Sequence, residues 1–187
     1  MIRRISSNLE SFKSLDFKNG LNILLSDKSE GATERQSRNG AGKTSLVELV
    51  HFLTGGQVGK GNIFSSATLG ENTFNILMDV GNKEVTVERT GFSPGKVRVD
   101  RRVENWLELA KTRKNPEILE LSNTNWREIL GAEWFGLDTA KAEEKFKPSF
   151  RSLFSYFVRR EGSGGFINPT QHSSMQQIWD NQVNNSY

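Results

Sequence analysis

The sequence predicts an α/β fold that contains an antiparallel β-hairpin. Three patterns support this class: a short apolar run that suits a buried strand, a helix pattern that is apolar on most sides, and two strand patterns around a hairpin turn. The three segments are 21–26, 46–53 and 73–89. With 187 residues, the chain has the size of one domain or one large lobe of a domain.

The first 26 residues are predicted to form strands. The apolar residues of 12–17 precede Asn19-Gly20, a pair that strongly favours a two-residue hairpin turn. Leucine and isoleucine dominate 21–26, so this segment is predicted to be a strand that is buried on both faces. The polar residues 27–36 are predicted to be a surface loop.

The helix pattern over 46–53 ends at Gly55-Gly56, and glycine commonly ends helices. An apolar helix of this kind belongs inside a layered domain. The hairpin further along has strands at 73–80 and 84–89, joined by a Gly-Asn turn.

The rest of the chain is predicted in less detail. A third strand is expected at 96–100, and helices are expected near 102–112 and 123–133, the last of them capped by Ser122-Asn123-Thr124. The aromatic-rich segment 149–160 fits a strand or a buried helix, because periodicity alone does not distinguish the two.

The composition excludes several classes of protein. The chain has no cysteine and two histidines, so disulfides, thiolate metal sites and His-based metal clusters are excluded. It shows neither the apolar run of a secretory signal nor an 18-residue apolar stretch, so we expect a cytoplasmic protein without a membrane span. The net charge of +3 permits contact with nucleic acid but does not argue for it.

One motif carries chemistry. The stretch Asn39-Gly40-Ala41-Gly42-Lys43-Thr44-Ser45 ends in the Gly-Lys-Thr of a phosphate-binding loop and opens the apolar helix. Glycines let backbone N–H groups converge on one anion, and the helix N-terminus adds its positive dipole end. The Lys43 ammonium is expected to reach the β and γ phosphates, and the Thr44 hydroxyl is expected to bind Mg²⁺. ATP with Mg²⁺ is the predicted ligand.

The motif departs from the strict pattern at its first position. Ser37 stands where the pattern has glycine, and a polar insert of ten residues precedes it, so the entry geometry of the loop is open. A flexible turn before a helix is the structural alternative. The sequence context, an apolar strand pattern before the loop and an apolar helix after it, favours nucleotide binding.

The order of these segments resembles a known family. The residues of 12–24, the motif over 39–48 and the helix end at 52–55 resemble the N-terminal lobe of SMC/RecF/SbcC-type ATPase heads, which are ABC-class P-loop NTPases. Further along, 125–137 and 150–160 resemble a poorly characterised bacterial subgroup of coiled-coil ATPases.

The resemblance implies a P-loop NTPase head with an antiparallel β edge sheet. It implies that 39–45 bind the nucleotide and that Lys13 occupies the place of a basic residue near the phosphates; a solvated strand lysine is the alternative for Lys13. Members of the family carry a glutamine that reaches Mg²⁺, but this chain has Arg160-Glu161 where that glutamine is expected. Gln171 is a weaker candidate in a glutamine-rich tail.

Two parts of a complete head are not found in the sequence. We find no run of four apolar residues followed by Asp-Glu, and Ser163-Gly164-Gly165 lacks the context of a signature motif and is predicted to be a turn. By resemblance, these parts follow a long coiled coil. We therefore expect 1–160 to be the N-terminal lobe and 161–187 to be a polar tail that leads toward the coiled coil and the second lobe.

The resemblance implies that two ATPase heads function as a pair. Two heads would bind ATP between them and use hydrolysis as a switch, with DNA as a common partner in repair or antiphage defence. Hydrolysis is expected only when a C-terminal lobe or a partner chain completes the site. A stand-alone nucleotide-binding module without catalysis is the alternative, and a small P-loop phosphotransferase is a weaker one.

Three remaining signals have structural explanations. The basic stretch 96–114 is predicted to be a solvated surface rather than a nucleic-acid contact. Trp126, Trp134 and Phe135 have the spacing of a core seam, and His51 on the apolar helix is predicted to be packed.

Overall fold

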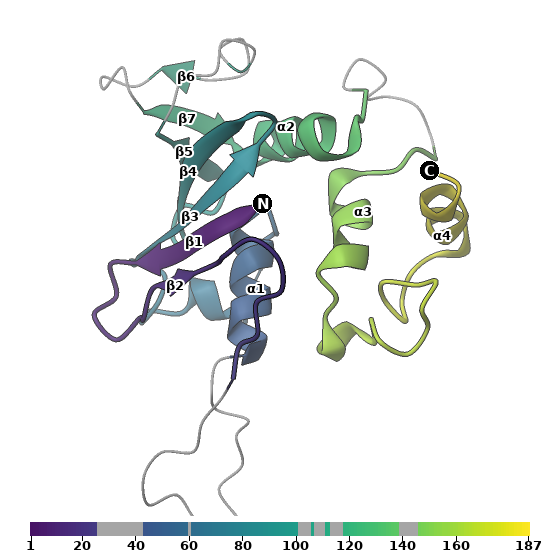
Figure 1. The fold of residues 1–187 in the computed structure, drawn as a ribbon, viewed down its shortest axis with the longest axis horizontal. Coiled ribbons are helices and arrows are strands. Elements are labelled where there is room, and N and C mark those ends of the chain that lie inside the picture. The colour runs from purple at the N-terminus through teal and green to yellow at the C-terminus, as the bar shows by residue number, and fades with distance from the viewer. Residues whose placement is uncertain (26–42, 60, 101–105, 107–110, 113–117, 139–145) are drawn as a thin grey trace, which may run out of the picture.

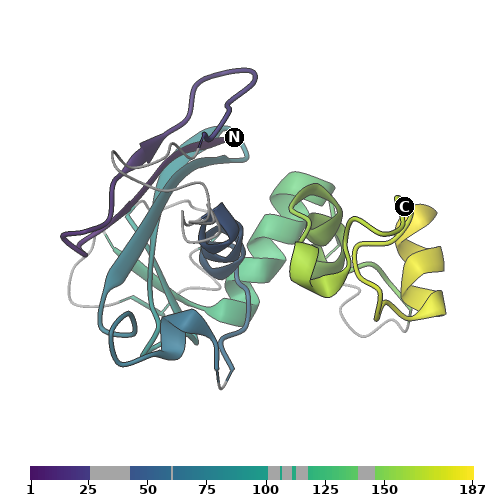
Figure 2. The same cartoon turned by 90° about the horizontal axis from the view of Figure 1, so that it is seen from below.

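The computed structural model describes residues 1–25, 43–59, 61–100, 106, 111–112, 118–138 and 146–187. These residues form a layered α/β structure in which one sheet is covered on one face by helices (Figures 1 and 2). The strands are β1 (Ile2–Ser7), β2 (Leu15–Asp16), β3 (Thr73–Val80), β4 (Lys83–Thr90), β5 (Lys96–Val99), β6 (Lys111–Thr112) and β7 (Leu119–Ser122). The helices are α1 (Lys43–Leu53), α2 (Asn123–Phe135), α3 (Phe150–Phe157) and α4 (Ile178–Asn185), with short 3-10 turns η2 (Ile63–Ser65) and η4 (Glu161–Ser163).

The sheet has seven strands in the order β2-β1-β3-β4-β5-β7-β6, and every neighbouring pair among them is antiparallel. The predicted hairpin is confirmed: β3 pairs with β4 from Thr73↔Thr90 to Val80↔Lys83. Gly81 takes a φ of 60° in the turn between them, a conformation that favours glycine. The third predicted strand is also confirmed, as β5.

Side chains alternate across the sheet and define its two faces. In β3 the even-numbered residues from Phe74 to Val80 are buried, and the residues between them are half-buried on the other face. Together with their counterparts in the neighbouring strands, the buried residues form the core against α1 and α2. The sheet therefore has an apolar inner face and a polar outer face.

Ion pairs cover the polar outer face. Arg98 contacts Glu88 at 2.7 Å across the β4–β5 pair, and Lys96 contacts Glu120 at 3.3 Å across the β5–β7 pair. At the other end of the sheet, Arg3 contacts both Asp79 and Glu84. Charges of opposite sign thus face each other along much of the sheet.

The C-terminal end of α1 is buried, and side chains from other elements satisfy its carbonyl groups. The Trp126 indole N–H donates to Leu53 O at 3.0 Å, and Asn123 Nδ2 donates to Gly55 O at 3.1 Å. Arg89, on β4, donates to the carbonyls of Phe52 and Gly56. The last carbonyls of a helix otherwise lack partners, so these contacts fix α1 between the sheet and α2.

Helices α2 and α3 begin at serine caps. Ser122 accepts a hydrogen bond from Asn125 N, which confirms the predicted cap of α2, and Ser149 caps α3 in the same way. The segment 149–160, for which strand and helix were both open, is a helix over Phe150–Phe157. Its buried residues pack on α2, where Trp134 and Phe135 contact Phe150.

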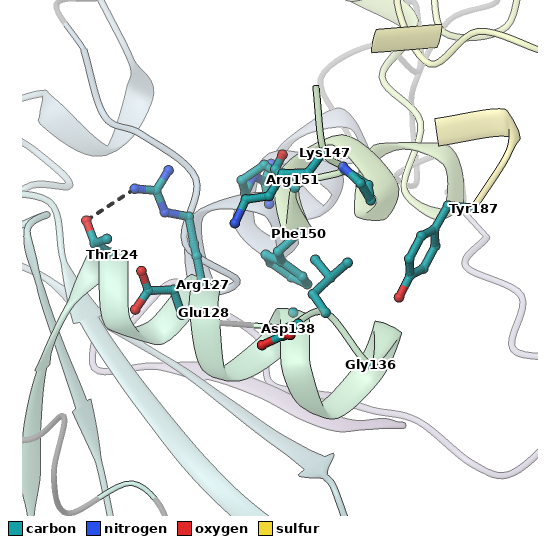
Figure 3. Close-up of a pocket in the computed structure, with 13 residues that line it drawn as sticks. Thr124, Arg127, Glu128, Gly136, Asp138, Lys147, Phe150, Arg151 and Tyr187 are labelled. Carbon is teal, nitrogen blue, oxygen red and sulfur yellow. Dashed lines mark hydrogen bonds between the residues drawn. The ribbon is translucent and has the colours of Figure 1, made fainter. Parts of the chain in front are cut away.

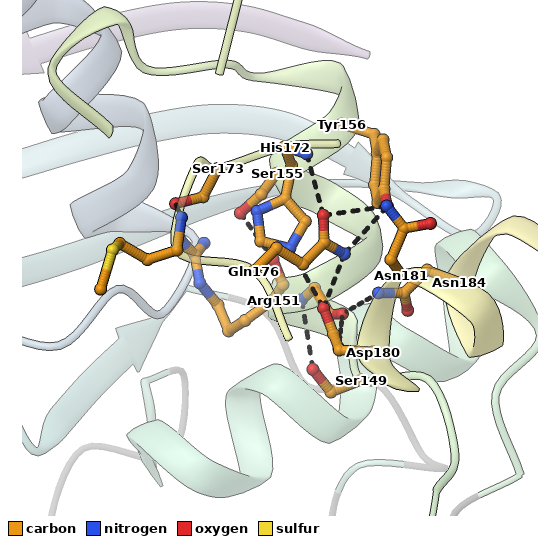
Figure 4. A network of polar contacts seen from close by, with 12 residues as sticks. Ser149, Arg151, Ser155, Tyr156, His172, Ser173, Gln176, Asp180, Asn181 and Asn184 are labelled. Carbon is orange, nitrogen blue, oxygen red and sulfur yellow. Dashed lines mark hydrogen bonds and ion pairs between the residues drawn. The ribbon is translucent and has the colours of Figure 1, made fainter. Parts of the chain in front are cut away.

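The residues after Glu161, predicted to be a polar tail, fold back onto α3. Asp180 lies at the centre of a network in which Ser152 Oγ donates to it at 2.8 Å and Gln176 Nε2 at 2.7 Å (Figure 4). Asn184 Nδ2 donates to the Ser152 hydroxyl at 2.6 Å. Ser163-Gly164-Gly165 forms a turn, as predicted, with Gly164 at a φ of 73°.

Two predictions of local structure are wrong. The segment 21–25 is not a strand, and its leucines are exposed, with Leu21 86% and Leu25 77% accessible. The physical reason is that no strand among the described residues pairs with this segment, so nothing covers its apolar side chains. The helix expected near 102–112 does not reach its predicted end, because Lys111–Thr112 pairs with β7 as strand β6. Most of that predicted helix, and Ser26, lie outside the described residues.

Candidate functional site

The last three residues of the predicted phosphate loop, Lys43, Thr44 and Ser45, are the first three residues of α1. Asn39, Gly40, Ala41 and Gly42 lie outside the described residues. Helix α1 begins at Lys43, and Thr44 and Ser45 lie exposed in its first turn. No acidic residue stands in that turn, so the positive end of the helix dipole is not offset there by a neighbouring carboxylate of the helix itself.

An ion pair lies one turn along α1 from Thr44. The Arg160 guanidinium contacts Glu48 at 2.7 Å through Nε, and its Nη2 donates to the second carboxylate oxygen at 2.9 Å. This pair holds the segment after α3 against α1. Arg160 thus lies beside the helix that carries Thr44, at the chain position where the family resemblance leads one to expect a glutamine.

His51 is buried in α1, as predicted, and its partners fix its protonation state. Nε2 lies 2.8 Å from Val158 O, which can only accept a hydrogen bond, so Nε2 carries the proton. Nδ1 then accepts from Arg151 Nη2 at 2.5 Å. Burial and the nearby guanidinium groups of Arg151 and Arg160 lower the pKa of His51 to about 3. The imidazole is therefore a neutral connector between α1 and α3.

Two arginines lie near the C-terminal end of α1: Arg89 is buried, and Arg151 is half-buried. Burial and repulsion from Arg151 and Arg127 lower the pKa of Arg89 to about 9. Burial and repulsion from Arg160 and Arg127 lower the pKa of Arg151 to about 10. Arg89 also lies over the Phe52 ring, 4.5 Å from its centroid. These cations face the negative end of the α1 dipole, which complements them.

The network at α4 contains Ser152, His172 and Asp180, but it is not a nucleophilic triad. Ser152 Oγ donates directly to Asp180, and His172 Nε2 contacts the other oxygen of the same carboxylate at 3.4 Å. Among the hydrogen bonds of the described residues, none joins His172 to Ser152, so no base is placed to activate the hydroxyl. The network is structural.

The other predicted site residues are placed separately. Lys13 lies exposed between β1 and β2, and the described contacts do not join it to α1. Of the basic stretch, Lys96 and Arg98 face acidic residues on the sheet. No group of three or more potential metal ligands occurs in the part of the chain that the structure describes. Within those same residues, no helix has the length and apolar character needed to cross a membrane.

Sequence analysis missed the arginines around the C-terminal end of α1. Arg89, Arg127 and Arg151 come from three different elements, and only the folded chain brings them together. One local signal was available: the first turns of α2 and α3 follow serine caps but contain no acidic residue.

Comparison with known proteins gives no match to a family model, to a curated protein or to a solved structure.

Proposed function

We propose that this chain is the ATP-binding lobe of an SMC-like ATPase. The observation that carries the proposal is the position of the Gly-Lys-Thr motif: helix α1 begins at Lys43, and the hydroxyl of Thr44 lies exposed in its first turn. A phosphate loop needs this arrangement, because the backbone N–H groups at the helix start and the Thr hydroxyl act on the phosphates and Mg²⁺.

The setting of α1 supports the proposal. Its C-terminal end is held by contacts from other elements, which come from Arg89, Asn123, Trp126 and Arg151, so the helix is fixed at that end. Binding energy is then not lost to ordering the helix.

The exposed apolar segment 21–25 precedes the predicted phosphate loop. Its exposure agrees with the proposal that a second lobe completes the ATPase head. Leu21, Ile23 and Leu25 are all more than two-thirds accessible. Exposed apolar runs of this kind are unusual unless another surface covers them. In the proposed head, a lobe carrying the acidic catalytic strand covers this run, paired heads hydrolyse ATP, and the cycle acts on a partner such as DNA in repair or antiphage defence.

The decisive test is nucleotide binding by Lys43→Ala. We expect this variant to lose affinity for a fluorescent ATP analogue by at least about 100-fold, because the ammonium that neutralises the β and γ phosphates is gone. Lys18→Ala removes an equally charged, exposed side chain at the turn before 21–25 and serves as the matched control. Unchanged affinity in Lys43→Ala would remove the basis of the assignment.

A non-catalytic nucleotide-binding module remains the second candidate, because the sequence has no run of four apolar residues followed by Asp-Glu to supply a catalytic base. Glu48, the acidic residue one turn beyond Thr44, is paired with Arg160 through both carboxylate oxygens. A general base must be available to the attacking water. The measurement that separates the two candidates is ATP hydrolysis by the chain alone and with its completing lobe: turnover that appears only in the completed head supports the ATPase.

A further inference from the structure

A pocket lies at the opposite end of α1 from Thr44. It has a volume of about 490 Å³ and lies between α2 and the start of α3 (Figure 3). Arg151, which lines it, contacts Thr54 just beyond the end of α1. Thr54 is ten positions after Thr44 and directly follows α1, which corresponds to about 15 Å along the helix axis. The pocket is therefore separate from the N-terminus of α1, and binding there does not depend on ATP.

Two arginines line the pocket, and their hydrogen bonds go to neutral groups. Arg127 makes long contacts with its own helix, from Nε to Asn123 O at 3.3 Å and from Nη2 to Thr124 Oγ1 at 3.4 Å. Arg151 contacts His51 and Thr54, which are both neutral. Within the described chain, no ion pair joins either guanidinium to a carboxylate. The two charges instead repel each other, and this repulsion contributes to the lowered pKa of Arg151.

The starts of two helices add positive potential at the same place. Thr124 in the first turn of α2 lines the pocket, and so do Ser149 and Phe150 at the start of α3. An acidic residue in the first turn commonly offsets the dipole of a helix, but α2 and α3 have none. Two guanidinium groups and two helix N-termini thus converge on one volume, and this combination favours an anion.

The remaining charged residues of the pocket are of both signs. Lys147 adds a third cation, while Glu128 and Asp138 are its acidic residues. Asp138 lies beyond the end of α2, whereas Arg127 lies in the second turn of that helix. The two guanidinium groups therefore place a ligand anion between Arg127 and Arg151.

Apolar side chains form the wall next to the arginines. Leu137 and Phe150 line the pocket on either side of Gly131. A Cβ at Gly131 would lie 3.1 Å from Leu137 Cδ1 and 3.4 Å from Phe150 Cβ, so glycine preserves the space between them. A ligand that fills this pocket needs an apolar part as well as a charged one.

We propose that this pocket binds a small phosphate monoester, whose dianionic phosphate contacts Arg127 and Arg151 and whose organic part lies against Leu137 and Phe150. A dianion suits two guanidinium groups and two helix N-termini better than a single carboxylate does.

The test is calorimetric titration of the full chain with phenyl phosphate, with inorganic phosphate and phenol as its two halves. We expect saturable binding of phenyl phosphate at least 10-fold tighter than either half. Arg127→Met keeps most of the alkyl stem that packs near Gly55 but removes the charge, and it should weaken binding at least 10-fold. Arg127→Lys should retain part of the affinity, which separates loss of charge from loss of fold.

Two controls make the result specific. Arg4→Met makes the same change at a residue that is 52% exposed on β1, and it should bind like the wild type. Lys43→Ala should also bind phenyl phosphate normally, so failure of the ATP site would not be mistaken for failure of this one. No saturable binding by the wild type, or equal binding by Arg127→Met, would overturn the proposal. If inorganic phosphate binds as tightly as phenyl phosphate, the proposed contact of an organic group with Leu137 and Phe150 is wrong.

Discussion

At the scale of single residues, His51 shows how neighbours determine a protonation state. Its Nδ1 accepts from Arg151 and its Nε2 donates to Val158 O, so the neutral ring is the form that joins α1 to α3. Protonation would place a third positive charge beside Arg151 and Arg160. The folded protein therefore disfavours the charged form strongly, whereas the unfolded chain accepts a proton at the ordinary pKa of about 6.5.

This difference predicts acid sensitivity. Because the pKa of His51 is lowered to about 3 on folding, the unfolded state binds the extra proton first as the pH falls below about 6.5. The free energy of unfolding should decrease by about 2 kcal/mol between pH 7 and pH 5. Urea unfolding at both pH values measures the change.

The matched variant for that measurement is His51→Gln, which cannot take up a proton. It should flatten the pH dependence between pH 7 and pH 5, whatever its absolute stability. The carboxylates of Asp79 and Asp180, whose pKa values are lowered, lose their contributions only below about pH 4, outside this window. Equal slopes in the two proteins would contradict the assignment.

At the scale of elements, the serine caps decide where α2 and α3 begin. Ser149 Oγ accepts from Ser152 N at 3.1 Å, so Ser149→Ala should lower the free energy of unfolding by about 1 kcal/mol. Ser11→Ala, at an exposed turn residue, is the control. Chemical denaturation of both variants checks the prediction, and equal stability would show that the cap contributes nothing.

Several elements with local signals were predicted correctly, although the Asn19-Gly20 turn signal is not followed by a strand. The Gly81-Asn82 turn specifies the β3–β4 hairpin, and the Ser122 cap specifies the start of α2, because each depends on neighbours in the chain. Segment 149–160 was open because its aromatic residues suit burial in either conformation. Segment 21–26 was predicted wrongly because an apolar run shows only that burial is possible, whereas a strand also needs a partner strand.

The two candidate sites also differ in whether a local sequence signal predicts them. The phosphate-loop motif is contiguous, so the sequence alone predicts it, although its loop lies outside the described residues. The pocket between α2 and α3 depends on Arg127 and Arg151, which lie 24 positions apart in sequence and line one pocket only in the folded chain. No spacing rule in the sequence signals that combination.

At the scale of the whole molecule, the C-terminal segment acts as a cover for α3. Asp180 and Asn184 both bond to Ser152, and Gln176 bonds to Tyr156 on the same helix. Removal of 161–187 should expose this side of α3 and lower the melting temperature by at least about 5 °C. Differential scanning calorimetry of the shortened and full chains measures the effect.

A point variant supports that comparison. Asp180→Ala removes the centre of the network without removing the segment, and it should lower the melting temperature in the same direction by a smaller amount. If the shortened chain melts at the temperature of the full chain, residues 161–187 do not stabilise α3.

The order of the strands has a consequence for association between molecules. The outermost strands, β2 and β6, contain two residues each, and β2 pairs with only part of β1. A neighbouring chain that tried to extend the sheet would find few backbone groups to pair with on either outermost strand. Short edge strands of this kind oppose fibre-like aggregation. Contacts between copies are thereby directed away from strand addition.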